Sequence, residues 1–217
     1  MNLIFDSTNE PRQRFNGIGA LTEEEDETAY ERTNLEGILD VYVLPVQNFR
    51  IGLGYRYVNY DVGLSFEDLK EEEGIEFLQD TPLAEGLNGL DGATVQSIRG
   101  NIIYDHRDQE FAPSKGFFAK LTLARNFLTD VETPEIPDAF NSLSLDVRQY
   151  FSDPSQRLVG LIRGGLELKS ESDIPFYELS ALGGPMNMRG YDFERFLGQH
   201  AGSVSYTHLT LPTILLV

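Results

Sequence analysis

Residues 182–198 read LGGPMNMRGYDFERFLG, the stretch that most strongly indicates the fold of this chain. Four glycines and one proline within 17 residues exclude a helix and interrupt a strand, so the stretch predicts a shaped loop. At its centre, the Arg189 guanidinium offers five donors in a rigid plane, and Gly190 lets the backbone approach another surface closely. We expect the loop to present Arg189 to a fixed partner, although Arg-Gly-Tyr by itself would also fit a solvated hairpin.

Six segments outside this loop alternate apolar and polar residues with the two-residue period of a β-strand. They are Arg32–Leu44, Phe49–Tyr57, Val95–Asp105, Gly116–Phe127, Leu143–Arg148 and Leu158–Leu168. Their polar faces carry full charges, namely Glu36, Asp40, Arg50, Arg56, Arg99, Asp105, Lys120, Asp146, Arg148, Arg163 and Glu167. One apolar and one charged face suit lipid outside and a wet lumen inside a barrel, but a soluble β-sandwich shows the same alternation.

The connections between these segments alternate in length. Those at 45–48, 106–115 and 152–157 are short, those at 64–93 and 169–198 are long, and 128–138 is intermediate. Membrane barrels have tight turns at the periplasmic mouth and larger loops outside. The rhythm therefore favours an antiparallel transmembrane β-barrel, with the Arg189 loop on its outer side.

The composition excludes several classes of function. A net charge of −18 argues against nucleic acid as a partner. No apolar run approaches the roughly 18 residues of a membrane-spanning helix, and the chain has no cysteine for disulfides, metal ligation or thiol catalysis. The acidic runs at 23–27 and 71–73 are expected to be solvated loops, because they lack the spacing of a calcium site.

The sequence also gives little support for an enzymatic function. His106, His200 and His208 are the only histidines, and none of them forms a pair with metal-ligand spacing. No serine stands in a nucleophile elbow, and the glycine pairs lie inside strand segments rather than before a helix. We therefore expect no catalytic residues, no cofactor and no metal.

A second motif, YDHRDQEFAPSKG at 104–116, predicts a charged turn between two strands. Asp105, Arg107 and Asp108 can cross-brace such a hairpin, and Pro113 and Gly116 then restart the strand. Three motifs stand in the order seen in one family. They are the FNGIG at 15–19, this charged turn at 104–116, and the pattern L-G-G-x(4)-R-G-Y-x(3)-R-F-x-G at 182–198. The set resembles the bacterial surface antigen superfamily, the outer-membrane β-barrels of the BamA/TamA type, over most of residues 12–200.

The resemblance implies an all-β, partial barrel over residues 1–203, about strands five to eleven of sixteen plus the signature loop that folds into the lumen. In the family, the arginine of this loop contacts acidic residues of the inner wall. Carried over to this chain, the signature-loop brace would consist of Gly183, Gly184, Arg189, Gly190, Tyr191, Arg195 and Gly198. The periplasmic hairpin motif would consist of Asp105, Arg107, Asp108, Pro113 and Gly116. The main acidic partner of Arg189 would lie on a strand beyond this chain, with Asp146 and Glu167 as candidates for secondary contacts.

Both ends of the chain carry expectations of their own. Residues 204–217 resemble a translated sequencing-adaptor read-through, so we expect a non-native tail rather than a genuine last strand. The first six residues lack the basic start and apolar run of a secretory signal. Since an outer-membrane protein needs such a signal, either the chain is not one or its beginning is missing. The resemblance implies the second, with the POTRA domains and the other strands missing as well.

By resemblance, the protein would assemble or insert outer-membrane proteins, or translocate polypeptides, in the bacterial outer membrane and would not be an enzyme. Its partners would be outer-membrane lipid and client outer-membrane or secreted polypeptides. Assembly-complex lipoproteins would be reached through the POTRA domains, and nucleic acid is not expected. The alternatives are the C-terminal anchor barrel of a fused patatin-like lipase, a passive porin and a soluble β-sandwich.

Overall fold

A computed structural model describes residues 2–19, 21–22, 28–63, 76–78, 84, 86–130, 136–155 and 158–210. Within these residues, eight long strands form one antiparallel sheet. They are β1 (Asn2–Phe15), β2 (Thr28–Val46), β3 (Phe49–Gly63), β5 (Ala93–Asp105), β6 (Gly116–Thr129), β7 (Ala139–Ser152), β8 (Leu158–Lys169) and β11 (His200–Thr210). The short β4 (Glu76–Phe77) pairs in parallel with β2. Between β8 and β11 lie a 3-10 turn at Phe176–Glu178 and a small sheet of β9 (Ser180–Leu182) and β10 (Phe196–Gly198).

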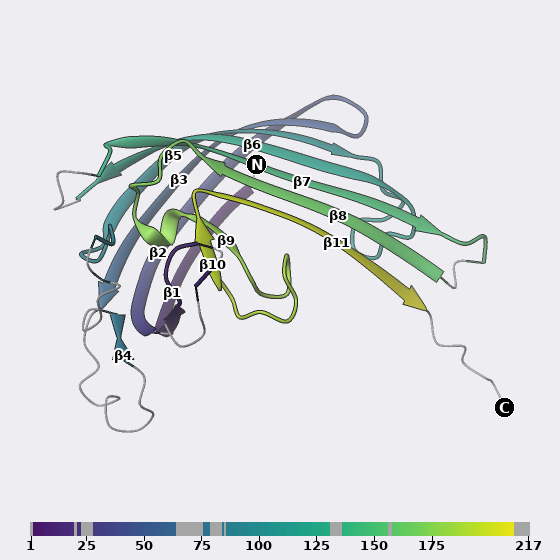
Figure 1. Ribbon diagram of the computed structural model, residues 1–217. Helices are drawn as coiled ribbons and strands as arrows, with labels where there is room; N and C mark the ends of the chain where they lie inside the picture. Colours follow the sequence, from purple (N-terminus) through teal and green to yellow (C-terminus); the bar gives the residue numbers. More distant parts are fainter. Residues whose placement is uncertain are drawn as a thin grey trace.

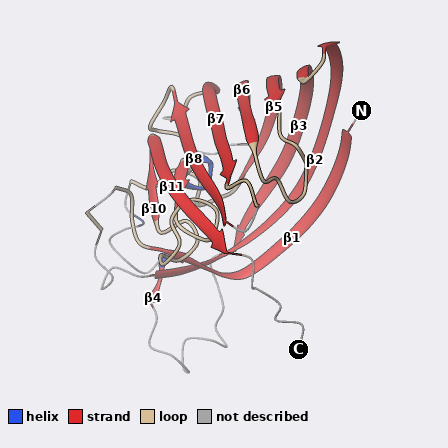
Figure 2. Ribbon diagram, turned by 90° about the vertical axis from the view of Figure 1, so that its right-hand side faces the viewer, coloured by secondary structure: helices blue, strands red, loops and turns tan. Residues whose placement is uncertain are grey.

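The long strands lie side by side in chain order, β1-β2-β3-β5-β6-β7-β8-β11, as an up-and-down meander. The sheet is curved and open, with β1 and β11 at its edges (Figures 1 and 2). The connections at 47–48, 106–115 and 153–157 join the strands at one end, and those at 16–27, 64–92, 130–138 and 170–199 join them at the other. The predicted antiparallel partial barrel is confirmed. The predicted alternation of connection lengths holds except at 130–138, which is one residue shorter than 106–115.

Two of the long strands, β1 and β11, lie outside the six predicted segments. β1 continues to Phe15, and Pro11 lies where its register with β2 shifts between Glu10 and Gln13. Proline is tolerated at such an irregularity of an edge strand, since no ladder hydrogen bond is lost there. β11 pairs with β8 through to Thr210, and thus crosses the predicted boundary at residue 204.

In the second half of β11, Val204 and Tyr206 are exposed while Ser203 and Ser205 are half-buried, so the two-residue period continues. The non-native origin of residues 204–217 stays a prediction. Residues 211–217 lie outside the described residues, as do the acidic runs at 23–27 and 71–73.

The two faces of the sheet differ in chemistry. On the convex face, Ile51, Leu53 and Tyr55 of β3 are exposed, and Leu53 is 67% accessible. The concave face carries paired charges: Arg99 lies 2.7 Å from Asp40, and Arg56 lies 2.5 Å from Glu36. No helix among the described residues is long and apolar enough to cross a membrane.

The concave face becomes apolar toward the end with the long connections. Its buried side chains there include Phe15, Tyr30, Val58, Tyr60, Val95 and Phe140, and the segment between β8 and β11 covers them with Ile174, Phe176, Tyr177, Leu179 and Leu197. The Phe176 ring meets those of Phe15 and Tyr30 edge-on, at 5.3 and 5.0 Å between centroids. The sequence predicted a charged, wet face throughout; this part of the face is dry because a connecting segment packs on it.

Candidate functional site

The segment between β8 and β11 folds back under the arch of the sheet (Figure 1). The Arg163 guanidinium of β8 donates to the Met186 carbonyl at 2.6 Å and lies 3.0 Å from the Asp146 carboxylate on β7. Arg148 approaches the same carboxylate at 2.6 Å. Asp146, a predicted secondary contact, therefore reaches the loop through Arg163. Glu167 lines a small cavity shared with the loop residue Asn187.

Gly183 and Gly184 have the backbone freedom that the motif predicts, with φ of 135° and 84°. They also allow a close approach within the loop. A Cβ at Gly183 would lie 2.1 Å from the Asp192 carbonyl oxygen, and a Cβ at Gly184 would lie 2.7 Å from the Phe193 ring. The glycine pair thus lets the returning segment 192–195 pack directly against the outgoing one.

Replacing Gly183 by alanine should therefore loosen the loop. We expect the free energy of unfolding of the loop to fall by about 1–3 kcal/mol, because the new Cβ meets backbone and not a flexible side chain. Gly190 offers the matched control: its φ is 104°, but nothing lies within 4 Å of its Cβ position. Limited trypsin digestion of the inserted protein should cleave the loop of Gly183→Ala faster than that of Gly190→Ala. Equal rates would show that the close approach does not matter.

The tip of the loop is exposed. Arg189 donates from Nε to the Pro185 carbonyl at 3.4 Å, and within the described part of the chain no carboxylate contacts its guanidinium. The Tyr191 carbonyl accepts from the Gly184 amide at 3.0 Å, which closes the tip, and the Tyr191 ring packs edge-on against Phe196. Gly190 supplies the left-handed turn between them.

Arg195, the second arginine of the motif, is buried. Its guanidinium donates to the Thr22 hydroxyl at 2.7 Å and to the Thr22 carbonyl at 2.8 Å. Next to it, the Leu197 carbonyl accepts from the Gly19 amide at 2.8 Å. The end of the motif, including Gly198 in β10, is thus joined to the connection that follows β1.

Three acidic residues of the same segment reach arginines of the wall, and the sequence did not single them out. Glu178 Oε1 lies 3.0 Å from Arg56 Nη1, Glu194 lies 3.2 Å from Arg32, and Asp192 lies 2.6 Å from Arg14. Asp192 and Glu194 occupy positions that the motif leaves unspecified between its Tyr and its second Arg. Their only sequence signal is an acidic residue on either side of Phe193.

Glu178 is buried with its partners. Tyr60 donates its hydroxyl proton to Glu178 Oε1 at 2.8 Å, and Arg56 Nη2 donates to the Tyr60 oxygen at 2.9 Å. Burial opposes the ionisation of Glu178, but the charges of Arg56 and Lys169 and the two hydrogen bonds outweigh it, so its pKa lies below the ordinary value. Glu178 is therefore a carboxylate at neutral pH.

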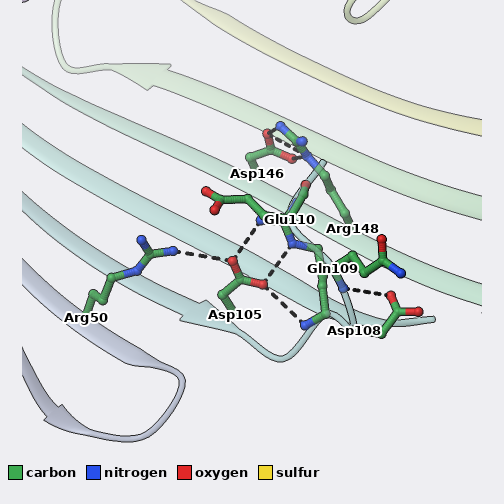
Figure 3. A network of polar contacts seen from close by, with 8 residues as sticks. Arg50, Asp105, Asp108, Gln109, Glu110, Asp146 and Arg148 are labelled. Carbon is green, nitrogen blue, oxygen red and sulfur yellow. Dashed lines mark hydrogen bonds and ion pairs between the residues drawn. The ribbon is translucent and has the colours of Figure 1, made fainter. Parts of the chain in front are cut away.

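The predicted hairpin motif forms a separate polar network at the short-turn end (Figure 3). Arg107 donates to both oxygens of Asp105, at 2.8 and 2.7 Å, and Arg50 lies 3.3 Å from the same carboxylate. Asp108 accepts hydrogen bonds from the Ser114 hydroxyl and from three backbone amides across the turn. These bonds, the Ser114 one first, lower the pKa of Asp108 to about 2.

The strand after this turn begins at Gly116, whose φ is 117°. A Cβ there would lie 2.2 Å from the His106 carbonyl, so the two arms of the hairpin approach too closely for a side chain. Pro113 lies half-buried before it. The motif thus builds a rigid turn whose charges are satisfied within the hairpin and the neighbouring strands.

The model of the Omp85 superfamily domain matches residues 11–210 of this chain. The chain belongs to the Omp85 superfamily. This membership confirms the predicted BamA/TamA-like outer-membrane barrel and its place in the bacterial outer membrane. Omp85 barrels of this type serve protein assembly and translocation and are not enzymes, in agreement with the sequence interpretation.

Solved structures give the same fold. A crystal structure of BamA from Haemophilus ducreyi lacking POTRA domains 1-3 matches with a TM-score of 0.52 at 14% sequence identity. The match covers 88% of this Omp85 chain and 38% of that chain, so the sequence spans well under half of the solved protein. A comparison with curated proteins gave no match.

Proposed function

We propose that this Omp85 chain supplies part of the wall and the inward-folded loop of a barrel that inserts outer-membrane proteins or translocates polypeptides. The observation that carries the proposal is the path of the loop across the concave face. It is held by Arg163 of β8 on one side, and by Arg32 of β2 and Thr22 on the other. A segment tied to strands near both edges of the sheet lies inside the barrel lumen, as the resemblance implies for the signature loop of the BamA/TamA type.

The proposed partners follow from the two faces. The exposed convex side chains would contact outer-membrane lipid, and client outer-membrane or secreted polypeptides would use the interior and edges of the complete barrel. Assembly-complex lipoproteins would bind through POTRA domains. The Arg107-braced hairpin lies at the short-turn end, which is the periplasmic end in this proposal.

In this proposal, Arg189 and its neighbours Gly190 and Tyr191 are the working tip of the loop. A guanidinium that folds into a lumen requires a carboxylate or several acceptors to offset the loss of water. Within the described residues, Arg189 makes one long hydrogen bond to a carbonyl. Its proposed partner is therefore an acidic side chain on a wall strand of the complete barrel.

The test is Arg189→Ala in the full-length protein. Because a charge-assisted hydrogen bond contributes about 2 kcal/mol, we expect a marked loss of client assembly or secretion, while the barrel still inserts and keeps its heat-modifiable gel migration. Arg189→Lys keeps the charge but not the planar fork, and should be intermediate. Wild-type activity of the alanine variant would contradict the proposal.

A further inference from the structure

We propose that the loop is positioned by a carboxylate clamp, in which Glu178 and Glu194 of the loop grip Arg56 and Arg32 of the wall. The contacts of the clamp do not depend on the proposed function. Only the purpose of the clamp, which is to position the Arg189 tip, rests on that proposal. Its polarity is the reverse of the interaction expected for the tip, because here the loop supplies the acids and the wall supplies the arginines.

The first grip precedes the signature motif. Glu178 is 6% exposed and its partner Arg56 is 20% exposed, so both charges are largely removed from water. Arg56 also contacts Glu36 of β2, and Tyr60 bridges Arg56 and Glu178. Removing one member of such a set leaves a buried group without its partner, which is far more disruptive than losing a surface pair.

The second grip follows the motif tip. Glu194 lies 3.2 Å from Arg32, whose side chain is 9% exposed, and accepts from the Gln13 amide at 3.2 Å. Its φ is 55°, a left-handed conformation that costs a non-glycine residue conformational energy. This conformation lies in the turn that the Arg195 amide closes on the Asp192 carbonyl at 3.3 Å, and it aims the Glu194 carboxylate at two wall side chains.

A neighbouring ion pair, between Asp192 and Arg14, is not part of the clamp. Asp192 and Arg14 meet at 2.6 Å, but their side chains are 60% and 52% exposed. Water and salt screen such a pair, so we expect it to add little. The clamp therefore consists of the two buried grips, one on each side of the Arg189 tip.

Gly183 connects the grips to the motif. The segment 192–195 can pack against it only because it lacks a Cβ, and this packing brings Glu194 toward β2. Glu178 and Glu194 are thus positioning residues. They touch the wall rather than a client, and they fix where the segment between them lies.

The experiment compares Glu178→Gln, Glu194→Gln and the double variant in the full-length protein inserted in lipid. Trypsin cleavage after Arg189 reports release of the loop. We expect each single variant to raise the cleavage rate about tenfold, since each loses a buried ionic contact. Asp173→Asn is the matched control, because Asp173 is an exposed acid of the same segment and contacts no wall arginine among the described residues.

A charge reversal separates positioning from general destabilisation. Glu194→Arg alone should release the loop, and adding Arg32→Glu should restore protection. Heat-modifiable migration checks that each variant still inserts, and Glu194→Gln keeps the test valid if Glu178→Gln fails to fold. Unchanged cleavage in Glu194→Gln, or no rescue by the reversed pair, would overturn the clamp. If the clamp variants release the loop while client assembly stays normal, the clamp stands and the working role proposed for the Arg189 tip fails. Loss of client assembly in a variant whose loop stays protected would instead overturn the clamp's positioning role.

Discussion

Replacing Asp40 by alanine is expected to destabilise the barrel wall by about 3 kcal/mol, because it leaves a buried guanidinium without its counter-ion. Arg99 Nη2 lies 2.7 and 2.8 Å from the two Asp40 oxygens, and Asn101 donates to one of them at 3.4 Å. The Asp40 side chain is 6% exposed, and among the described residues the buried Arg99 Nε has no hydrogen-bond partner. The denaturant midpoint of the protein refolded in lipid vesicles measures the effect.

Two further variants control this prediction. Asp40→Asn keeps an acceptor but not the charge, and should fall between wild type and alanine. Gly54→Ala should displace Asp40 without removing it, because the added Cβ would lie 1.9 Å from Asp40 Oδ1. A midpoint for Asp40→Ala equal to that of wild type would show that the pair is solvated and contributes nothing.

Replacing Leu53 by arginine should cost about 2–4 kcal/mol if the convex face lies in the hydrocarbon of the membrane. Leu53 is 67% accessible in the isolated sheet and has convex apolar neighbours in Val41, Tyr55 and Ile98. In water, an exposed leucine replaced by arginine changes stability very little. The size of the change in stability therefore shows whether this face contacts lipid or water. The unfolding assay in lipid vesicles measures this change.

The matched control is Ser144→Arg. Ser144 lies on the concave face of β7, two residues from Asp146, and is exposed there. An arginine at this position would face the lumen and should be tolerated. Equal stability of Leu53→Arg and Ser144→Arg would contradict the assignment of the two faces.

Much of the sheet could be predicted because membrane strands encode their two faces in a two-residue period. The alternation of Ile51, Leu53 and Tyr55 with Arg50 and Arg56 is visible in the sequence and returns as two faces of β3. β1 is not among the six predicted segments, because Pro11 and polar residues obscure the two-residue period at a register shift. The end of β11 falls in the stretch that resembles a translated read-through, so the sequence predicts a tail there rather than a strand.

The loop was identified from its glycines and Arg189, but its contacts were not. Short-range patterns cannot show that Glu178 lies beside Arg56, since the two are 122 residues apart in sequence. The same holds for the apolar cover: Phe176 and Leu179 resemble ordinary loop residues until the strand ends that they cover are known. Both the clamp and the dry part of the concave face depend on contacts between residues that are far apart in the sequence.

The central claim is that the sheet is a membrane wall with lipid on its convex face and the loop under its concave face. Spin labels on single introduced cysteines at residues 119–124 of β6, in the full-length protein in vesicles, test it most directly. The account predicts high accessibility to oxygen at residues 119, 121 and 123, and access of a water-soluble nickel complex only at the positions between them. Access of the nickel complex to all six positions, or the absence of a two-residue period, would contradict it.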